Sequence, residues 1–474
     1  ALLGDVNYVA GNQNWVVGNA NTIDAGDLNV VYGDQNFVDG NENTLIGMWR
    51  QGQFYIGYNT AIGDGNWIEG QNNWVEGSNS DVFGLDNSIQ GSDAWVLGDA
   101  NTAVNGDNAW IVGDRNSVTG PGAWVFGQDN VAGEGSTAIG HDAIASGDFA
   151  MAIGPNTASG DYSFAAGFNS IAAGEGSVAI GDGALADSTG SIAIGDGAHA
   201  ASSVAIGVGA QALGYQSTAV GDYAEATGYQ SAAIGANNDA LGMYSTAVGI
   251  YNYATAYDST AIGSYNDATG SDSTAVGNDN EATGDGSTAV GDWNLAAGDN
   301  STAMGAYNEA TGYESVAVGA DNVAVGGYSV AIGANNEALG LYSSAVGNFN
   351  NAYEYDSTAL GSWNDALGED STAVGNDNEA IGDGSTAVGD ANLAAGDYSS
   401  AMGSFNEGIG YESVAVGHEN IAVGDYSAAV GTYNQTYGVD AAAVGVENFA
   451  IGDWSVAMGS YNEAWGEESA AVGV

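Results

Sequence analysis

Residues 208–473 consist of consecutive seven-residue units, and this repetition constrains the fold more than any other feature of the chain. Each unit ends in Gly, which we number place 7, except at Ala256 and Glu354. Place 3 alternates between Ser, as in Ser245, and Asn, as in Asn252, so the true period is a pair of units. A repeat this short and this rich in glycine indicates a solenoid of stacked coils and not a globular domain.

Each unit reads as a β-strand. In the unit S-T-A-V-G, small and apolar residues alternate with a period of two, which is strand periodicity. A coiled coil is excluded because glycine at every seventh place would cost a helix about 1 kcal/mol each time. We therefore predict an all-β solenoid with 14 residues per coil, a strand of about five residues in each half-coil, and coils stacked ~4.8 Å apart.

Alternation along the strand predicts which residues face the interior. Places 3, 5 and 7 share one face, whereas place 4 of the Asn halves is often acidic, as in Asp267, and must face water. Ser or Asn, Ala and Gly are therefore expected inside, where a coil this short has room for little else. Stacked Asn side chains can form hydrogen bonds from coil to coil. The predicted interior ladder includes Asn238, Asn252, Asn266, Asn280 and Asn294.

The same parity turns a row of aliphatic side chains outward at place 6 of the Ser halves. An exposed apolar row opposite an acidic face predicts lateral association through the apolar side. The row comprises Val220, Ile234, Val248, Ile262, Val276, Val290, Met304, Val318 and Ile332. Large side chains about one coil apart, Trp95, Trp110 and Trp124, are predicted to continue this surface toward the N-terminus.

The repeat divides the chain into three regions. Residues 1–133 carry an Asn- and Trp-rich variant with a break in phase at 48–63, where we expect a bulge or loop. Residues 134–207 are irregular repeats, and residues 208–474 are the regular ones. Within the regular region, the segment that begins at Tyr257 recurs 98 residues later at Tyr355. This duplication, which we call the super-repeat, favours an elongated body whose length matters more to its function than any single residue.

Composition limits the partners. The chain has 59 acidic and two basic residues, Arg50 and Arg115, and its net charge is −57. That charge excludes nucleic acid bound through phosphate contacts and argues against anionic membranes. It favours a saline habitat, in which counter-ions screen the repulsion. There is no Cys, no apolar run long enough to insert into a membrane, and no polar cap at either end, so we expect a fragment or end-to-end stacking.

The motif S-V-A-I-G at Ser177–Gly181 and Ser203–Gly207, with S-x-A-V-G-x-x-N-x-A-x-G further on, resembles the head repeats of trimeric autotransporter adhesins, the YadA-like left-handed parallel β-roll. The resemblance covers residues 134–473, and residues 1–133 resemble an Asn-rich variant of such heads. It implies a parallel homotrimer at the cell surface, outside the cell, that adheres to cells, matrix or abiotic surfaces. The apolar row and the three Trp residues would then form the trimer interface. A surface filament or viral spike built by stacking the same roll end to end is an alternative.

The residues point away from catalysis. His141, His199 and His418 have no partners at ligand spacing, and the carboxylates are exposed and repeated, whereas a catalytic pair is singular and lies in a pocket. We predict a protein that is not an enzyme and needs no cofactor. Calcium is the one open question, because acidic turns can share cations between coils, although solvated turns are favoured. The candidate calcium ligands are Asp285, Asp299, Asp383 and Asp397.

Two further surface features are open to more than one interpretation. Turn-borne Tyr residues, such as Tyr215 and Tyr313, are either contact points for a ligand or packing between coils. A row of Thr residues that recurs once per coil resembles the flat faces of ice-binding solenoids, and ice binding is the rival function. The row runs Thr246, Thr260, Thr274, Thr288 and Thr302 and is interrupted at Val316.

Overall fold

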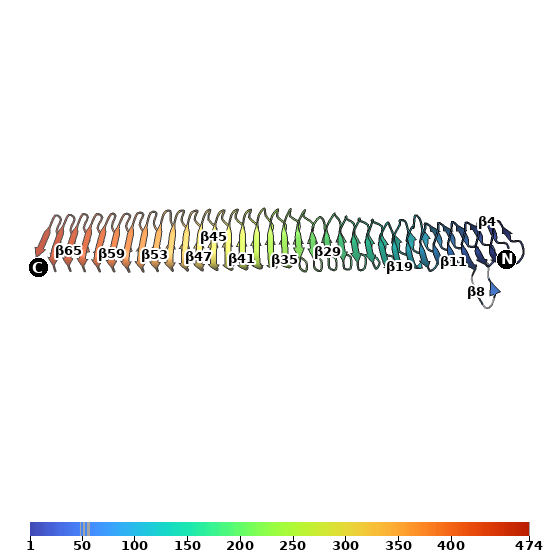
Figure 1. Ribbon diagram of the computed structural model, residues 1–474. Helices are drawn as coiled ribbons and strands as arrows, with labels where there is room; N and C mark the ends of the chain where they lie inside the picture. The colour runs from blue at the N-terminus through green and yellow to red at the C-terminus, as the bar shows by residue number, and fades with distance from the viewer. Residues whose placement is uncertain (48, 51–52, 55–56, 474) are drawn as a thin grey trace. The chain divides into compact units, whose positions relative to one another are not determined.

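The computed structural model describes residues 1–47, 49–50, 53–54 and 57–473. The chain divides into two compact units, Ala1–Asn237 and Asn238–Val474, here called the N-terminal and C-terminal units. Each unit is a parallel β-solenoid whose successive coils appear as successive arrows in Figure 1. The prediction of an all-β parallel solenoid with about 14 residues per coil is confirmed.

Two sheets form the walls of the coil. The odd-numbered strands other than β9 make sheet A, and the even-numbered strands other than β8 make sheet B. The described pairings within both sheets are parallel and join equivalent places of consecutive coils. Thr260 pairs with Thr274 in sheet A, and Asp267 pairs with Glu281 in sheet B. The parallel register follows from the repeat, because every coil presents the same pattern of donors and acceptors to the next.

The C-terminal unit is regular throughout. In sheet A, a five-residue strand recurs once per coil from β37 (Thr246–Ile250) to β67 (Val456–Ser460), and β69 (Ala470–Gly473) follows. In sheet B, a two-residue strand recurs once per coil from β36 (Asp239–Ala240) to β68 (Glu463–Ala464). The Ser halves therefore supply sheet A and the Asn halves supply sheet B.

The strands of the N-terminal unit vary more in length and spacing. Its sheet A contains β1 (Leu2–Leu3), β3 (Trp15–Val17), β5 (Val30–Tyr32), β7 (Thr44–Gly47), β11 (Trp67–Gln71), β13 (Asp81–Leu85), β15 (Trp95–Leu97), β17 (Trp110–Asp114), β19 (Trp124–Gln128), β21 (Thr137–His141), β23 (Met151–Ile153), β25 (Phe164–Ala166), β27 (Val178–Ile180), β29 (Ile192–Ile194), β31 (Val204–Ile206), β33 (Thr218–Val220) and β35 (Ala232–Ala236). Its sheet B contains β2 (Tyr8–Val9), β4 (Thr22–Ala25), β6 (Phe37–Asp39), β10 (Thr60–Ile62), β12 (Trp74–Glu76), β14 (Ser88–Gln90), β16 (Thr102–Ala103), β18 (Ser117–Val118), β20 (Val131–Ala132), β22 (Ile144–Ala145), β24 (Thr157–Ala158), β26 (Ile171–Ala172), β28 (Leu185–Ala186), β30 (His199–Ala200), β32 (Gln211–Ala212) and β34 (Glu225–Ala226).

One coil of the N-terminal unit is longer than the others. Thr44 of β7 pairs directly with Trp67 of β11, and Phe37 pairs with Thr60, so this coil takes 23 residues instead of 14. Between them lie two short antiparallel strands, β8 (Trp49–Arg50) and β9 (Gln53–Phe54), which Figure 1 shows outside the wall of the coil. The rest of the predicted break in phase at 48, 51–52 and 55–56 lies outside the described residues.

The expectation of five-residue strands in both halves is wrong for sheet B. In the C-terminal unit the strands of both sheets begin at place 4, as at Thr246 and Asp239, but those of sheet B end at place 5. The chain turns there: the N–H groups of Leu241 and Gly242 both donate to the carbonyl of Ala254, and the N–H of Ser245 donates to the carbonyl of Gly242. The strands of sheet B are therefore shortened at their ends and not at their starts.

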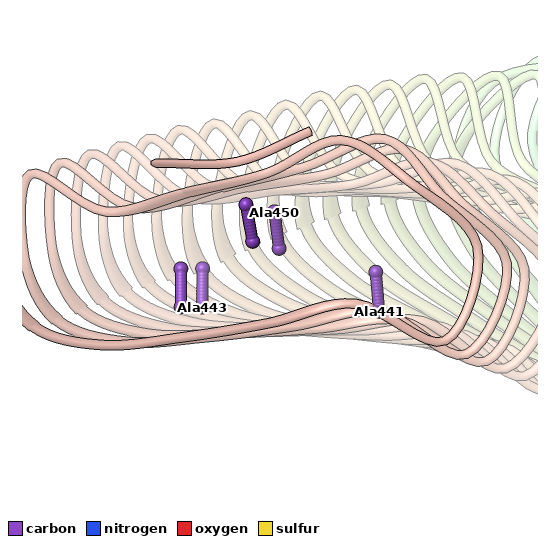
Figure 2. Packing of buried hydrophobic residues seen from close by; sticks show 5 residues of the cluster. Ala441, Ala443 and Ala450 are labelled. Carbon is purple, nitrogen blue, oxygen red and sulfur yellow. The ribbon is translucent and has the colours of Figure 1, made fainter. Parts of the chain in front are cut away.

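The interior is narrow and lined by small side chains. Figure 2 shows Ala441 and Ala443 on one wall of a coil pointing toward Ala450 on the other. Ala at place 5 is fully buried in coil after coil of the C-terminal unit. The expectation that a coil has room only for such small residues is wrong in the first coils of the N-terminal unit, up to Val125, where most coils enclose a branched side chain from each sheet. These buried side chains include Val16, Ile23, Val31, Val38, Leu45, Ile68, Val75, Val82, Ile89, Val96, Ile111 and Val118.

Place 7 also departs from simple alternation. Gly270, in an Asn half, is buried as expected, but Gly277, in a Ser half, is half-exposed and has a φ of +127°. At that φ the strand bends into the turn, and a side chain at Gly277 would overlap the carbonyl of Gly291 in the next coil. Glycine is required there by close approach of the coils, not by an inward-facing position.

Candidate functional site

The Asn side chains of the interior form a continuous hydrogen-bond ladder in the C-terminal unit. Nδ2 of Asn266 donates to Oδ1 of Asn252 at 2.9 Å and to the carbonyl of Gly277 at 2.8 Å. Oδ1 of Asn266 accepts from the backbone and side-chain nitrogens of Asn280, at 3.2 and 2.9 Å. The same contacts recur at Asn238 and Asn294, and all five ladder residues are buried. Each Asn thereby ties its own turn to the coils before and after it.

In the N-terminal unit, Asn also occupies place 3 on both walls of the first coils. Asn14 bonds to Asn29 on one wall, and Asn21 bonds to Asn36 on the other. Sequence reasoning did not anticipate this second ladder, although the alternation of N-x-V-x-G on both half-coils carried the signal. These buried amides belong to the scaffold.

The outward face of sheet A carries the aliphatic row in register. In the single chain Ile234, Ile262, Met304 and Ile332 are 38–42% exposed, and the intervening Val residues are half-buried. Val248 pairs with Ile262, and Ile262 with Val276, so the side chains of the C-terminal unit form one continuous strip. The remaining members, Val220, Val290 and Val318, occupy the same place in their coils.

The three Trp residues lie beside this strip and not in it. Trp110 packs between Trp95 and Trp124, with ring centroids 5.1 and 5.5 Å apart. Trp124 pairs with Thr137, which is a place 4 residue. The residues that continue place 6 here are Leu97, Val112 and Phe126, and sequence reasoning missed them. Both rows face outward from sheet A, and the heptads Ser92–Gly98 and Pro121–Gly127 already separate them, with Trp at place 4 and Leu97 or Phe126 at place 6.

The candidate calcium ligands are engaged in backbone capping. Oδ1 of Asp285 accepts from the N–H of Ser271 at 2.9 Å, and Oδ1 of Asp299 accepts from the N–H of Asp285 at 3.1 Å. Asp383 and Asp397 make the equivalent bonds one super-repeat later. Each carboxylate therefore satisfies a turn N–H of the preceding coil, which is a structural use of the acid.

Each histidine has a carboxylate neighbour, contrary to the expectation of scattered His without partners. His199 Nε2 lies 2.7 Å from Asp187, and His418 Nε2 lies 3.3 Å from Glu419. His141 lies between Asp129 and Asp142, at 3.6 and 2.7 Å, and these three groups are close enough to share a cation. The sequence alone did not reveal the contact between His141 and Asp129, because the two residues belong to consecutive coils and meet only when the coils stack.

The group around His141 already contains a cation. Arg115 binds both oxygens of Asp129, at 2.7 and 2.8 Å. This bond and the charge of Arg115 hold the pKa of Asp129 below its ordinary value. Because Arg115 neutralises the central carboxylate, the cluster is a solvent-exposed ion-pair network rather than a preformed metal site.

In the described part of the C-terminal unit, sheet B and the adjoining turns carry two shallow grooves. One groove of about 460 Å³ is lined by aromatic and acidic residues from Asp321 to Asp377, and a second of about 280 Å³ by residues from Tyr265 to Leu295. In the first, the Tyr353 hydroxyl donates to Oε2 of Glu337 at 2.8 Å, and burial together with this carboxylate raises the pKa of Tyr353 to about 12. These grooves bring together chemistry that is dispersed in the sequence.

The fold defines the chain as a repeat protein, a parallel β-solenoid. No helix in the described part of the chain is long and apolar enough to cross a membrane. The family model described as "YadA head domain repeat (2 copies)" matches residues 132–224, 226–252, 254–308, 310–406 and 409–434, which is more than half of the chain. The chain therefore belongs to the YadA head domain repeat family, a structural domain of surface-exposed adhesins, and the resemblance is confirmed. A comparison with curated proteins found no match.

Proposed function

We propose that the chain is the head of an extracellular, cell-surface adhesin that works as a homotrimer of parallel, left-handed rolls and attaches its bearer to cells or surfaces. Membership of the YadA head repeat family supports adhesion and display at the surface. The observation that carries the trimer is the continuous aliphatic strip on sheet A, including Ile262, Met304 and Ile332. An apolar strip of this length on an otherwise acidic surface needs a partner, and a second and third copy supply the same strip.

The trimer is tested by placing charge in the strip. Ile262→Asp, Val276→Asp and Val290→Asp together should convert a trimer into monomers, because each aliphatic side chain contributes roughly 1.5–3 kcal/mol when buried and each Asp would be a buried, unpaired charge. The matched control, Thr269→Asp, Thr283→Asp and Thr311→Asp, adds the same charge at place 6 of sheet B and should leave the trimer intact. Mass by light scattering or sedimentation decides the outcome. A wild-type monomer at micromolar concentration would refute the trimer.

Adhesion is tested separately. Beads coated with the wild-type chain should retain cells, matrix or abiotic particles better than beads coated with the same mass of an unrelated acidic protein. Electron microscopy of the same material distinguishes separate heads from filaments built by end-to-end stacking. Equal retention by both kinds of bead would refute the adhesive role.

Ice binding has one observation in its favour. Thr246, Thr260 and Thr274 pair in register on the outward face of sheet A, and the row continues to Thr302 before Val316 interrupts it. This row borders the aliphatic strip, so a trimer formed through sheet A would restrict access to it. A monomer with thermal hysteresis would favour ice binding, and a trimer without hysteresis favours the adhesin.

A further inference from the structure

The turns that lead into sheet B of the C-terminal unit carry a recurrent arrangement of rings and acids. Three nearly parallel pairs of rings stack between consecutive coils at place 2 of the Asn halves. They are Tyr251–Tyr265 at 5.1 Å and 10°, Trp293–Tyr307 at 6.4 Å and 7°, and Phe349–Trp363 at 4.2 Å and 12°. The second ring of each pair, Tyr265, Tyr307 or Trp363, is 55–56% exposed. Stacking therefore covers one side of this ring and leaves much of the rest in contact with solvent.

Two carboxylates flank every second ring. One is two residues further along the strand, at place 4, and the other occupies place 2 of the next coil. The resulting aromatic–carboxylate triads are Tyr265/Asp267/Asp279, Tyr307/Glu309/Asp321 and Trp363/Asp365/Asp377. The two grooves contain the first and third triads, and Asp321 of the second triad also lines the larger groove. The next residue in the stack is an Asp, which is too short to cover the exposed ring.

The chain itself shows what such a triad can hold. Phe405, Glu407 and Glu419 lie one super-repeat after the second triad, with Ala391 in place of the stacked Trp. There the imidazole of His418 lies edge-on against Phe405, with centroids 6.1 Å apart, and its Nε2 is 3.3 Å from Glu419. A nitrogen heterocycle of the chain thus lies between ring and carboxylate in this fourth arrangement. The equivalent residues beside the three triads are Asn278, Ala320 and Asn376, of which Asn278 donates to Oδ2 of Asp279 at 2.6 Å and Asn376 donates to Asp390.

We propose that the three triads bind arginine side chains of an extended, basic polypeptide. A guanidinium group stacks on an aromatic ring and binds carboxylates through two parallel hydrogen bonds, which combines both features of a triad. The described residues that line the groove of the third triad include Asp321, Glu337, Asp365 and Asp377 and no basic residue, so its charge is complementary to such a partner. This inference names the class of partner that is bound, which adhesion in general does not. It rests on the proposed function in one respect: a trimer formed through sheet A leaves sheet B accessible.

The spacing of the triads sets the spacing of the arginines. Tyr265 and Tyr307 are three coils apart, and Tyr307 and Trp363 are four coils apart. At ~4.8 Å per coil these separations are about 14 and 19 Å, which an extended chain spans with about four and six residues. A partner with arginines at those intervals can occupy the three triads at once, and the second and third contacts are then intramolecular.

The test uses the full chain and three synthetic peptides at ~0.15 M salt, where charges beyond ~8 Å are largely screened. The first peptide carries three Arg at intervals of four and six residues in a Gly/Ser background, the second carries Lys at those places, and the third carries three adjacent Arg. We expect the spaced Arg peptide to bind tightest by calorimetry. Asp279→Asn, Asp321→Asn and Asp377→Asn together should weaken it roughly tenfold, since each removes one exposed carboxylate–guanidinium pair, which is worth about 1.5- to 5-fold in affinity.

The matched control removes the same charge from the opposite turns. Asp258, Asp272 and Asp370 also lie at place 2, with φ between 52° and 55°, but in the Ser halves. Asn tolerates this left-handed backbone, so both triple variants keep the fold, which circular dichroism checks. The control triple, each Asp→Asn, should change the affinity less than twofold. Equal weakening by both triples, or equal binding of the Arg and Lys peptides, would overturn the proposal.

Two further measurements distinguish an arginine site from a simple cation site and from a failure of the trimer. If spermine or Ca²⁺ bound wild type and not the triad variant, while the Arg peptide bound both alike, the carboxylates would hold simple cations and the proposal would be wrong. Mass is measured on the same samples. A trimer that fails to bind the peptide refutes only the arginine site, and a monomer that binds it refutes only the trimer.

Discussion

An asparagine side chain inside a coil offers two donor hydrogens and an acceptor oxygen, and the interior uses all of them. Nδ2 of Asn336 donates to Asn322 and to the carbonyl of Gly347, at 2.8 and 2.9 Å, and its Oδ1 accepts two bonds from Asn350. The ladder thus satisfies polar groups of the turns that lead into the strands of sheet B.

We expect Asn336→Ala to destabilise the C-terminal unit by roughly 2–4 kcal/mol, because it leaves several buried polar groups without a partner at about 1–3 kcal/mol each. The urea midpoint and the amide exchange of the coils around residue 336 report the change. Asn348→Ala removes an exposed Asn from the end of β51 (Ser344–Asn348) and serves as the control. Equal effects of the two substitutions would show that the ladder does not stabilise the fold.

Glycine is needed at one turn and optional at the other. Gly319 has a φ of +128°, and a Cβ there would overlap the carbonyl oxygen of Gly333. Gly286 has a φ of +67°, like Asn300 at the same place one coil later, and its nearest neighbour is a side chain. Gly319→Ala should therefore lower the melting temperature clearly, and Gly286→Asn should not. A melting temperature that Gly319→Ala leaves unchanged would contradict this expectation.

Among the structural elements, the unit of construction is the whole coil and not the heptad. Ser halves supply sheet A with the aliphatic strip, and Asn halves supply sheet B with the acids and the ladder. In a solenoid each coil contacts only its neighbours, so stability is close to a sum over coils and interfaces. Insertions that keep the phase are therefore tolerated, as the longer coil between β7 and β11 illustrates.

Deleting a whole coil should be nearly neutral, and deleting half a coil should not. Removal of residues 420–433 joins Glu419 to Asn434 and keeps Asn over Asn, so we expect an unchanged melting temperature. Removal of residues 420–426 joins Glu419 to Ser427, which ends the ladder and transfers the aliphatic strip to the opposite wall. The shorter deletion should lower the melting temperature and reduce trimer formation. If the two deletions changed the melting temperature and trimer formation equally, the residue at place 3 would not specify the register of the coils.

For the molecule as a whole, the net charge of −57 governs stability. Equivalent carboxylates of consecutive coils are ~5 Å apart, where like charges repel by nearly 1 kcal/mol even in water. Burial raises the pKa of Asp267, and the charge of Glu281 in the next coil adds to this rise, so the repulsion accounts for part of it. Because the raised pKa favours the protonated form in the folded state, this contribution is present at acid pH and is lost as the pH rises through that pKa.

Salt should therefore stabilise the protein. The screening length falls from about 10 Å at 0.1 M to about 3 Å at 1 M, so the melting temperature should climb steeply with NaCl. Asp267→Asn, Glu281→Gln and Glu309→Gln together should reduce that slope. The control triple Glu314→Gln, Glu412→Gln and Asp440→Asn removes the same charge at places whose equivalents in the adjoining coils are not acidic. If micromolar Ca²⁺ alone produced the full gain, the turns at Asp285 and Asp299 would be specific ion sites and screening would be the wrong account.

The architecture could be predicted from the order of the residues. A glycine at every seventh place and the alternation of Ser with Asn suffice for a parallel β-solenoid with two units per coil, because a strand of period two leaves few other ways to bury Ala beside Ser or Asn. The family follows from the same motif. The residue types on each face could also be predicted, since one face must see water wherever Asp267 and its equivalents stand.

Which residues become neighbours depends instead on how the coils stack. The bonds of the interior ladder, such as Asn252 to Asn238, join residues one coil apart, which no propensity of single residues contains. The contacts of Trp110 with Trp95 and Trp124 depend on the stacking of three coils, because these residues are 14 or 15 positions apart in the chain. The triads follow the same logic, because Trp363 and Asp377 are a full coil apart in the chain and become neighbours only when one coil lies on the next. Local sequence sets the shape of a coil, whereas surface chemistry arises from the stacking of coils.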